Sequence, residues 1–270
     1  MNAMELIRHR RSVRTFDGRA LSREHAEKLM TCAQALKNPY DLPITWRLLS
    51  AKEQGLSSPV IAGTDTFIAG KLRRAPHAEE AFGFAFEKLV LYAESLGIGT
   101  TWIAGTMNRP AFERAMALEE GEVMPCVSPL GYPAAKMSLR ETMMRKGIRA
   151  DSRLDFPALF FDGSFERPLS PEAAGDAAQP REMVRWAPSA VNKQPWRVVL
   201  ASGAAHFYEK RSKGYVDGSG WDLQKVDVGI ALCHFACGLE EQGRSFHLTT
   251  EDPGLPTPEE TAYIASYVMD

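Results

Sequence analysis

The stretch "DVGIALCHFACGLEEQG" at residues 227–243 is apolar nearly all round and ends in a glycine. A helix with this character is buried in a core, and glycine is the commonest residue after a final helical turn. An earlier stretch, "AFGFAFEKLVLYAESLG" at residues 81–97, aligns with it without gaps. The aligned pair shares four positions: Gly83/Gly229, Ala85/Ala231, Glu94/Glu240 and Gly97/Gly243. The sequence therefore predicts two equivalent central helices.

Other matched pairs recur in the same order in both halves of the chain. They are "FDG" at 16–18 and 161–163, "LSRE" at 21–24 and "LSPE" at 169–172, and "WRLL" at 46–49 and "WRVV" at 196–199. Ser22 and Ser170 are candidate N-caps of the helices that follow. Similar segments in a constant order indicate an internal duplication. The charged, helix-prone stretch 139–160 is expected to connect the copies.

We therefore predict an α+β fold, with two copies of a small mixed sheet flanked by helices. The first copy, with its connector, is expected to occupy residues 1–150, and the second, shorter copy residues 151–270. The two copies would dock as an intramolecular pseudo-dimer, so a monomer is expected. Composition agrees with a globular chain of 270 residues, because 44% of them are hydrophobic and 24% charged.

Composition and charge also argue against several functions. The net charge of −2 gives no basic field for nucleic acid or a membrane surface. The sequence has no apolar run near the ~20 residues needed to cross a bilayer, nor the apolar core of a signal peptide. Only two of its four cysteines, Cys233 and Cys237, are close in sequence, so no metal site is expected. A reduced, cytoplasmic location is expected.

The two copies differ in polar segments that suit different roles. The first has "RRSVR" at 10–14, in which guanidinium groups and a hydroxyl would suit a phosphate, although a solvated basic segment has the same composition. The second has "APSAVNKQPW" at 187–196, a turn that could bond a planar heterocycle or simply join a helix to a strand. "GIGTTWIAG" at 97–105 reads as a helix end, a short strand and a glycine turn. The sequence lacks the dinucleotide-fold, P-loop and zinc-protease motifs.

Taken together, these segments resemble the FMN-dependent nitroreductase family, and the resemblance covers most of the chain. It rests on "RRSVRTF" (10–16), "LGIGTTWIAG" (96–105), "LGYP" (130–133) and "APSAVNKQPWRVV" (187–199). Ordinary members are homodimers with FMN at the subunit interface, where one subunit supplies RxSxR and the other the PSxxN loop. The present chain is similar to a subgroup in which two nitroreductase-like repeats are fused, so that its second copy would act as the partner subunit.

The resemblance implies cofactor-binding roles for thirteen residues. The first copy would supply Arg10, Arg11, Ser12 and Arg14 for the phosphate and ribityl chain, and Trp102, Ile103, Ala104 and Gly105 along the N5 edge of the flavin. The second copy would supply Pro188, Ser189 and Asn192. Either Lys136 or Arg140, after "GYP", would complete the phosphate site. The family often has an acidic residue where this chain has Ala104, which places the tuning of N5 in question.

The implied function is an FMN-dependent oxidoreductase that uses NADH or NADPH to reduce nitroaromatics, quinones or similar small-molecule acceptors by ping-pong hydride transfer. The cofactor carries the hydride chemistry, so no catalytic side chain is assigned. Two alternatives remain at this point: a flavin reductase or dehydrogenase for one specific metabolite, and a flavin-binding or sensing protein without significant turnover. Reduction of the flavin by nicotinamide, followed by reoxidation by an acceptor, separates the enzymes from the sensor.

Overall fold

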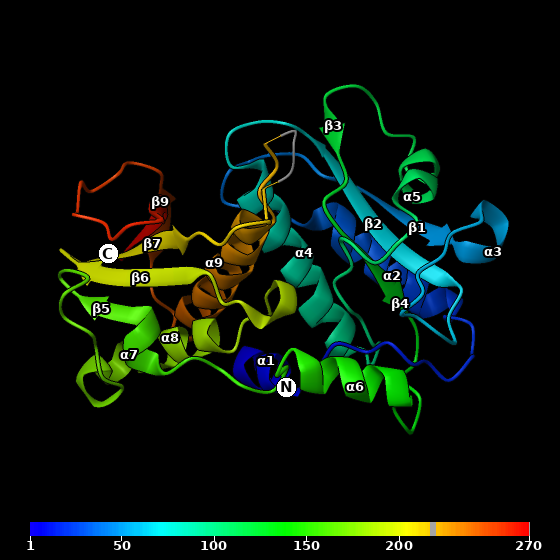
Figure 1. Cartoon of the computed structure of the whole chain (residues 1–270), viewed down its shortest axis with the longest axis horizontal. Helices are drawn as coiled ribbons and strands as arrows, with labels where there is room; N and C mark the ends of the chain where they lie inside the picture. Colours follow the sequence, from blue (N-terminus) through cyan, green and yellow to red (C-terminus); the bar gives the residue numbers. More distant parts are fainter. Residues whose placement is uncertain (217–219, 270) are drawn as a thin grey trace. The chain divides into compact units, whose positions relative to one another are not determined.

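The computed structural model describes residues 1–216 and 220–269 and contains two compact units, which we treat separately (Figure 1). One unit is Arg8–Ala150. The other combines Asp151–Asp270 with Met1–Ile7. The division falls between residues 150 and 151, and the first seven residues join the unit of the second repeat rather than that of the first.

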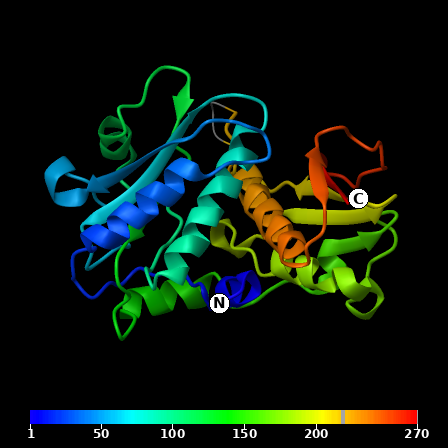
Figure 2. The same cartoon turned by 180° about the vertical axis from the view of Figure 1, so that it is seen from behind.

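The unit Arg8–Ala150 is built on strand β2, whose residues 67–72 are all buried. β1 pairs antiparallel with one edge of β2, and β3 and β4 pair antiparallel with the other. Helices α2 and α4 pack together and against this sheet (Figure 2). The elements are α1 (Ala3–His9, which begins in the other unit), α2 (Arg23–Ala35), β1 (Thr45–Ser50), α3 (Ala51–Gln54), β2 (Thr66–Arg73), α4 (Ala78–Ser95), α5 (Arg109–Ala115), β3 (Glu122–Val123), β4 (Val127–Leu130) and α6 (Leu139–Gly147).

The unit of residues 151–270 has a five-stranded sheet in the order β5-β6-β7-β9-β8. β5 and β6 are parallel and the other neighbours antiparallel, so this sheet is mixed. Helices α8 and α9 pack together, and α9 covers β6 and β7. The elements are α7 (Phe156–Leu159), β5 (Phe160–Asp162), the 3₁₀ helix η1 (Glu172–Ala177), α8 (Ala178–Arg185), the 3₁₀ helix η2 (Ala190–Asn192), β6 (Trp196–Ala201), β7 (Ala204–Lys210), α9 (Leu223–Glu241), β8 (Phe246–Thr249) and β9 (Thr261–Met269).

The same succession of elements recurs in the two units. "WRLL" and "WRVV" lie in β1 and β6, and each strand pairs antiparallel with the strand that follows it, β2 or β7. A long buried helix comes next, α4 or α9. The central strand then pairs antiparallel with a later one, β4 or β9. The α+β fold and its duplication are therefore confirmed.

The two central helices also end alike. Gly97 and Gly243 have positive φ angles of 71° and 63°, which glycine adopts without a steric cost. The following amides turn back onto the last helical turn, Ile98 N–H to Ala93 O at 3.0 Å and Arg244 N–H to Leu239 O at 3.1 Å. Both bonds span five residues, as in a Schellman cap. The glycine caps predicted from sequence are thus present in both copies.

Serine caps were predicted for two further helices. The Ser22 side chain accepts a hydrogen bond from the His25 amide at 3.2 Å and is the N-cap of α2. Ser170 accepts from the Ala173 amide at 3.3 Å, but the chain there begins with the 3₁₀ helix η1 before α8. The cap of α2 is confirmed, and Ser170 makes a cap-like bond at a less regular helix start.

Candidate functional site

The arginine-rich segment after α1 is extended and lies beside the chain that follows α4. Val13 N–H bonds Thr100 O at 2.8 Å, and Ser12 and Thr100 form a parallel bridge. A Cβ on Gly99 would come within 2.9 Å of the Val13 side chain, so the close contact depends on glycine. This contact fixes residues 10–14 against residues 98–101.

The segment after α4 is in turn paired with β4 and its continuation. Gly99 N–H bonds Gly131 O at 2.8 Å, and Ile103 and Val127 exchange two backbone bonds of 2.9 Å. The unit Arg8–Ala150 therefore places "RRSVR", "GIGTTWIAG" and "LGYP" side by side. These are the first-copy segments on which the sequence resemblance rests.

The arginines of this segment form a cationic cluster in which some donors have no protein partner. Arg10 is only 8% exposed, and within residues 1–216 and 220–269 its Nε and one Nη nitrogen donate no hydrogen bond, nor does one Nη nitrogen of Arg14. Burial lowers the pKa of Arg14, the Glu141 carboxylate raises it, and Arg145 and Arg10 lower it further. Buried guanidinium groups without an acceptor are costly. This cluster therefore suits an anion, such as a phosphate, that presents several oxygen acceptors.

One carboxylate, Glu141, accompanies the arginine cluster. It is 1% exposed and accepts a hydrogen bond from Arg11 Nη1 at 2.9 Å, while its Oε2 has no partner among the described residues. Glu141 lies in the first turn of α6 and Arg145 one turn later. One negative charge does not neutralise the surrounding guanidinium groups, so the cluster keeps an excess of positive charge.

Neither basic residue suggested after "GYP" occupies a place like that of Arg145. Lys136 and Arg140 are both exposed and flank Ser138, the N-cap of α6. Ser138 ties this segment to the arginine-rich stretch, because its hydroxyl and that of Thr15 lie 3.0 Å apart. The sequence analysis missed Glu141 and Arg145, although their spacing of four residues in a helix-prone stretch places both on one helical face.

The turn at residues 102–105 is held by two residues that the sequence analysis did not single out. Trp102 donates its indole N–H to Glu87, a fully buried carboxylate of α4, at 3.1 Å. Arg109 donates to three carbonyl oxygens, those of Met124 at 2.7 Å, Ala104 at 3.0 Å and Pro125 at 3.1 Å. The polypeptide around Ala104 is therefore fixed by a guanidinium group.

The second-copy loop, residues 188–194, has an unusual backbone. Val191, Asn192 and Gln194 have positive φ angles of 43°, 60° and 50°, which side chains other than glycine rarely adopt. The Ser189 hydroxyl accepts from Gln194 N–H at 2.8 Å and closes the loop.

The Asn192 side chain is engaged within its own unit. Its amide nitrogen donates to Ser152 O at 3.1 Å, and its oxygen accepts from Gln194 Nε2 at 3.3 Å. Asn192 therefore braces the loop, and its assignment to a cofactor stays a prediction, as do those of Pro188 and Ser189.

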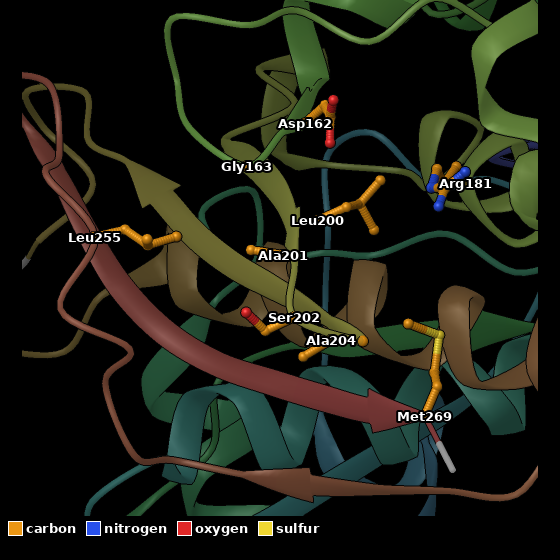
Figure 3. A pocket seen from close by; sticks show the side chains of 10 residues that line it. Asp162, Gly163, Arg181, Leu200, Ala201, Ser202, Ala204, Leu255 and Met269 are labelled. Atoms are coloured by element: carbon orange, nitrogen blue, oxygen red, sulfur yellow. The ribbon is translucent and has the colours of Figure 1, made fainter.

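A separate cavity of about 630 Å³ lies in the unit of residues 151–270 (Figure 3). Its lining combines Asp162, Arg181, Leu200, Ser202, Leu255 and Met269 with neighbouring small residues. Desolvation, with a smaller contribution from the charge of Arg244, lowers the pKa of Arg181 to about 10. None of the thirteen residues predicted to bind cofactor lines this cavity, so it is not the candidate site.

Two features are absent from the part of the chain that the structure describes. Across residues 1–216 and 220–269, no group of three or more histidine, cysteine or acidic side chains has a metal-binding arrangement. Over the same residues, none of the helices combines the length and apolarity of a membrane span.

Comparisons with known proteins agree on one family for this chain. The model of the family described as "Putative TM nitroreductase" matches residues 2–239. No curated protein matches the sequence significantly. Among solved structures, a protein of Thermotoga maritima MSB8 described as "a putative nitroreductase" is 20% identical to this chain. The match covers 100% of this chain and 94% of that one with a TM-score of 0.65, which shows that the two share a fold.

Shorter solved structures match about half of this chain. A nitroreductase family protein of Clostridium novyi NT is 19% identical, with a TM-score of 0.43 over 50% of this chain and 87% of that one. An FMN-dependent nitroreductase of Clostridium difficile R20291 is 15% identical, with a TM-score of 0.43 over 49% of this chain and 88% of that one.

Proposed function

Because the chain belongs to this nitroreductase family, whose model spans residues 2–239, we propose that it is an FMN-dependent oxidoreductase. It would use NADH or NADPH to reduce nitroaromatics, quinones or similar acceptors. The observation that carries the proposal is the arginine cluster at residues 10–14, with buried guanidinium nitrogens that lack protein acceptors among the described residues.

The arginine cluster fits the phosphate of FMN. Arg10 and Arg14 would donate to its oxygens, and Ser12 lies between them in the sequence. Arg145 adds positive charge beside Arg14, whereas Glu141 orients Arg11. Guanidinium groups form strong, charge-assisted bonds with phosphate oxygens, so the phosphate would anchor the cofactor. We assign Arg145 to this role ahead of Lys136 and Arg140, which are exposed.

The remaining segments would orient and shield the ring. The turn Trp102–Gly105, fixed by Glu87 and Arg109, would lie along its N5 edge. The loop with Pro188, Ser189 and Asn192 would contact the ring from the second copy. When bound, FMN supplies hydride transfer between the nicotinamide and the acceptor, and the protein supplies binding, orientation and electrostatics.

The absorption spectrum of the purified protein tests the proposal. We expect a flavin spectrum, either as isolated or after addition of FMN, and released cofactor that is identified as FMN. Anaerobic NADH or NADPH should bleach the flavin, and a nitroarene or quinone should restore it.

Other outcomes separate the alternatives. A flavin that remains oxidised in excess nicotinamide would favour a sensor. A flavin that is reoxidised by one metabolite, but not by nitroarenes or quinones, would favour a specific reductase. A protein that gains no flavin spectrum with FMN would contradict the proposal.

A further inference from the structure

The loop at residues 188–194 contacts an acidic side chain that the sequence analysis did not identify. The amide of Ala190 lies 3.1 Å from each carboxylate oxygen of Asp227. Asp227 lies in the second turn of α9 and is 4% exposed. Ala190 begins the short helix η2, so this bond holds the loop where its backbone turns.

A buried carboxylate at this position destabilises the folded chain unless it has a hydrogen-bond donor as a partner. The residues of α9 on either side of Asp227 are buried and apolar, and an acidic group in such surroundings is destabilising unless it is bonded. Burial raises the pKa of Asp227, the Ala190 hydrogen bond lowers it, and Asp222 and Glu209 raise it further. The protonated and ionised forms of the carboxyl both retain an oxygen that accepts from Ala190, so the contact does not require one protonation state.

The loop itself needs an external restraint. Three of its residues have positive φ angles without being glycine, and such conformations persist only where surrounding contacts hold them. The Ser189–Gln194 bond closes the loop internally, whereas Asp227 attaches it to the central helix. The first copy has Ala81 at the aligned position and lacks a PSxxN loop. The acid therefore occurs only in the copy that has this loop.

We propose that Asp227 is a positioning residue that holds the backbone of the PSAVN loop in the conformation that receives the flavin. This inference rests on the proposed function for the identity of the ligand. The contact between Asp227 and the loop does not depend on it, which allows the two to be tested separately.

The first test compares FMN dissociation constants at pH 8 for the full chain and three variants. Asp227→Ala removes the acceptor and should weaken FMN binding about tenfold or more, because the Ala190 amide then loses its hydrogen bond and the loop is no longer held in the binding conformation. Asp227→Asn keeps one acceptor oxygen and should stay within about threefold of the wild type. Glu209→Gln removes a different buried carboxylate of the acidic cluster formed by Asp227, Asp222 and Glu209. Its FMN dissociation constant should also stay within about threefold of the wild type.

The second test is amide hydrogen exchange of Ala190 in the FMN-free chain. We expect exchange at least tenfold faster in Asp227→Ala and little changed in Asp227→Asn, at a similar global melting temperature. Local loss of protection with rescue by asparagine distinguishes positioning from a general loss of stability. If Asp227→Ala does not fold, Ala190→Pro removes only the donor, and the extended backbone of Ser189 is compatible with a following proline.

The outcomes separate the inference from the proposed function. Wild-type affinity together with wild-type protection of Ala190 in Asp227→Ala, or wild-type affinity in Ala190→Pro, would overturn the inference. Equal weakening by Glu209→Gln would also overturn it, because the effect would then belong to the whole acidic cluster. A wild-type chain that binds no FMN would remove the proposed function, while exchange at Ala190 would still decide whether Asp227 holds the loop.

Discussion

At the scale of single residues, Arg14 offers a direct test of the phosphate site. Its guanidinium group is partly desolvated, and one of its nitrogens has no acceptor among the described residues. We expect Arg14→Ala to weaken FMN binding on the order of tenfold or more, since a charge-assisted hydrogen bond contributes about 1.5–3 kcal/mol. Isothermal titration of the apoprotein with FMN measures the change.

Arg23→Ala is the matched control for Arg14→Ala. Arg23 lies on the exposed face of α2 and pairs with Glu27, so its loss should leave FMN affinity unchanged. Equal affinities in the Arg14 variant and the wild type would show that the RxSxR segment does not bind the phosphate.

Glu209 should make stability depend on pH. It is fully buried in β7, and burial, together with the neighbouring Asp222 carboxyl and against the opposing effect of Arg211, raises its pKa to about 7. A group with a raised pKa in the folded state contributes stability that is complete below its ordinary value of 4.5 and is lost as pH rises through about 7. Glu209→Gln should therefore match the wild type near pH 4.5 and exceed it by roughly 3 kcal/mol at pH 8, because the pKa rises from 4.5 to about 7 and each pKa unit corresponds to about 1.4 kcal/mol.

Urea unfolding of both proteins at several pH values measures this difference. Glu27→Gln is the control, because that carboxylate is 63% exposed in a surface pair and should give a small difference with little dependence on pH. A difference between Glu209→Gln and the wild type that does not grow with pH would mean that the pKa of Glu209 is not raised in the folded protein.

The residues that could be recognised from sequence were those in motifs. "RRSVR" and "PSAVN" are recognisable because they combine several polar groups in a few positions. Asp227, Glu87 and Arg109 could not be recognised in this way, because each bonds the backbone or side chain of a residue outside its own helix. Their partners are determined by packing, which a single sequence does not show.

At the scale of elements, Gly99 determines how closely the arginine segment approaches residues 98–101. An alanine Cβ there would lie 2.9–3.0 Å from three atoms of the buried Val13 side chain. Gly99→Ala should therefore displace residues 10–14, destabilise the chain by roughly 1–3 kcal/mol and weaken FMN binding. Urea unfolding and FMN titration measure the two effects.

Gly147→Ala is the corresponding control in the same unit. Gly147 ends α6, and a Cβ there would meet no atom within 4 Å. Its replacement should leave stability unchanged or slightly increased, because alanine restricts the unfolded chain. If Gly99→Ala behaved like Gly147→Ala, the packing of Val13 would not position the arginines.

The elements themselves were predicted where a strong periodic or capping pattern occurs in sequence. The central helices α4 and α9, their glycine ends and the strands with "WRLL" and "WRVV" belong to this group. The extended form of residues 10–14 does not follow from the sequence, since the same residues could also form a helical turn. The parallel pairing of β5 with β6 was not predicted either, because pairing between distant strands depends on the tertiary fold.

At the scale of the whole molecule, the two copies share a framework of helices and strands but differ in their polar segments. "FPALF" at 156–160 stands where the first copy has its arginine cluster, and it forms α7 and the start of β5 with Phe156, Leu159 and Phe160 buried. The second copy in turn has the PSAVN loop and Asp227, which the first lacks. On the proposed function, divergence of this kind would leave complete only one of the two sites that a symmetric dimer has.

The stoichiometry of FMN follows from this asymmetry. A symmetric dimer has two equivalent interfaces, and fusion of two copies would give two related sites within one chain. Only one combination of segments supplies guanidinium groups for the phosphate, because the other would place it against the buried side chains of "FPALF". An unpaired phosphate dianion in apolar surroundings is strongly unfavourable. We therefore predict one FMN per chain in a monomer. Released flavin quantified against protein, with light scattering for the mass, tests this: two flavins per chain, or one flavin shared by two chains, would contradict it.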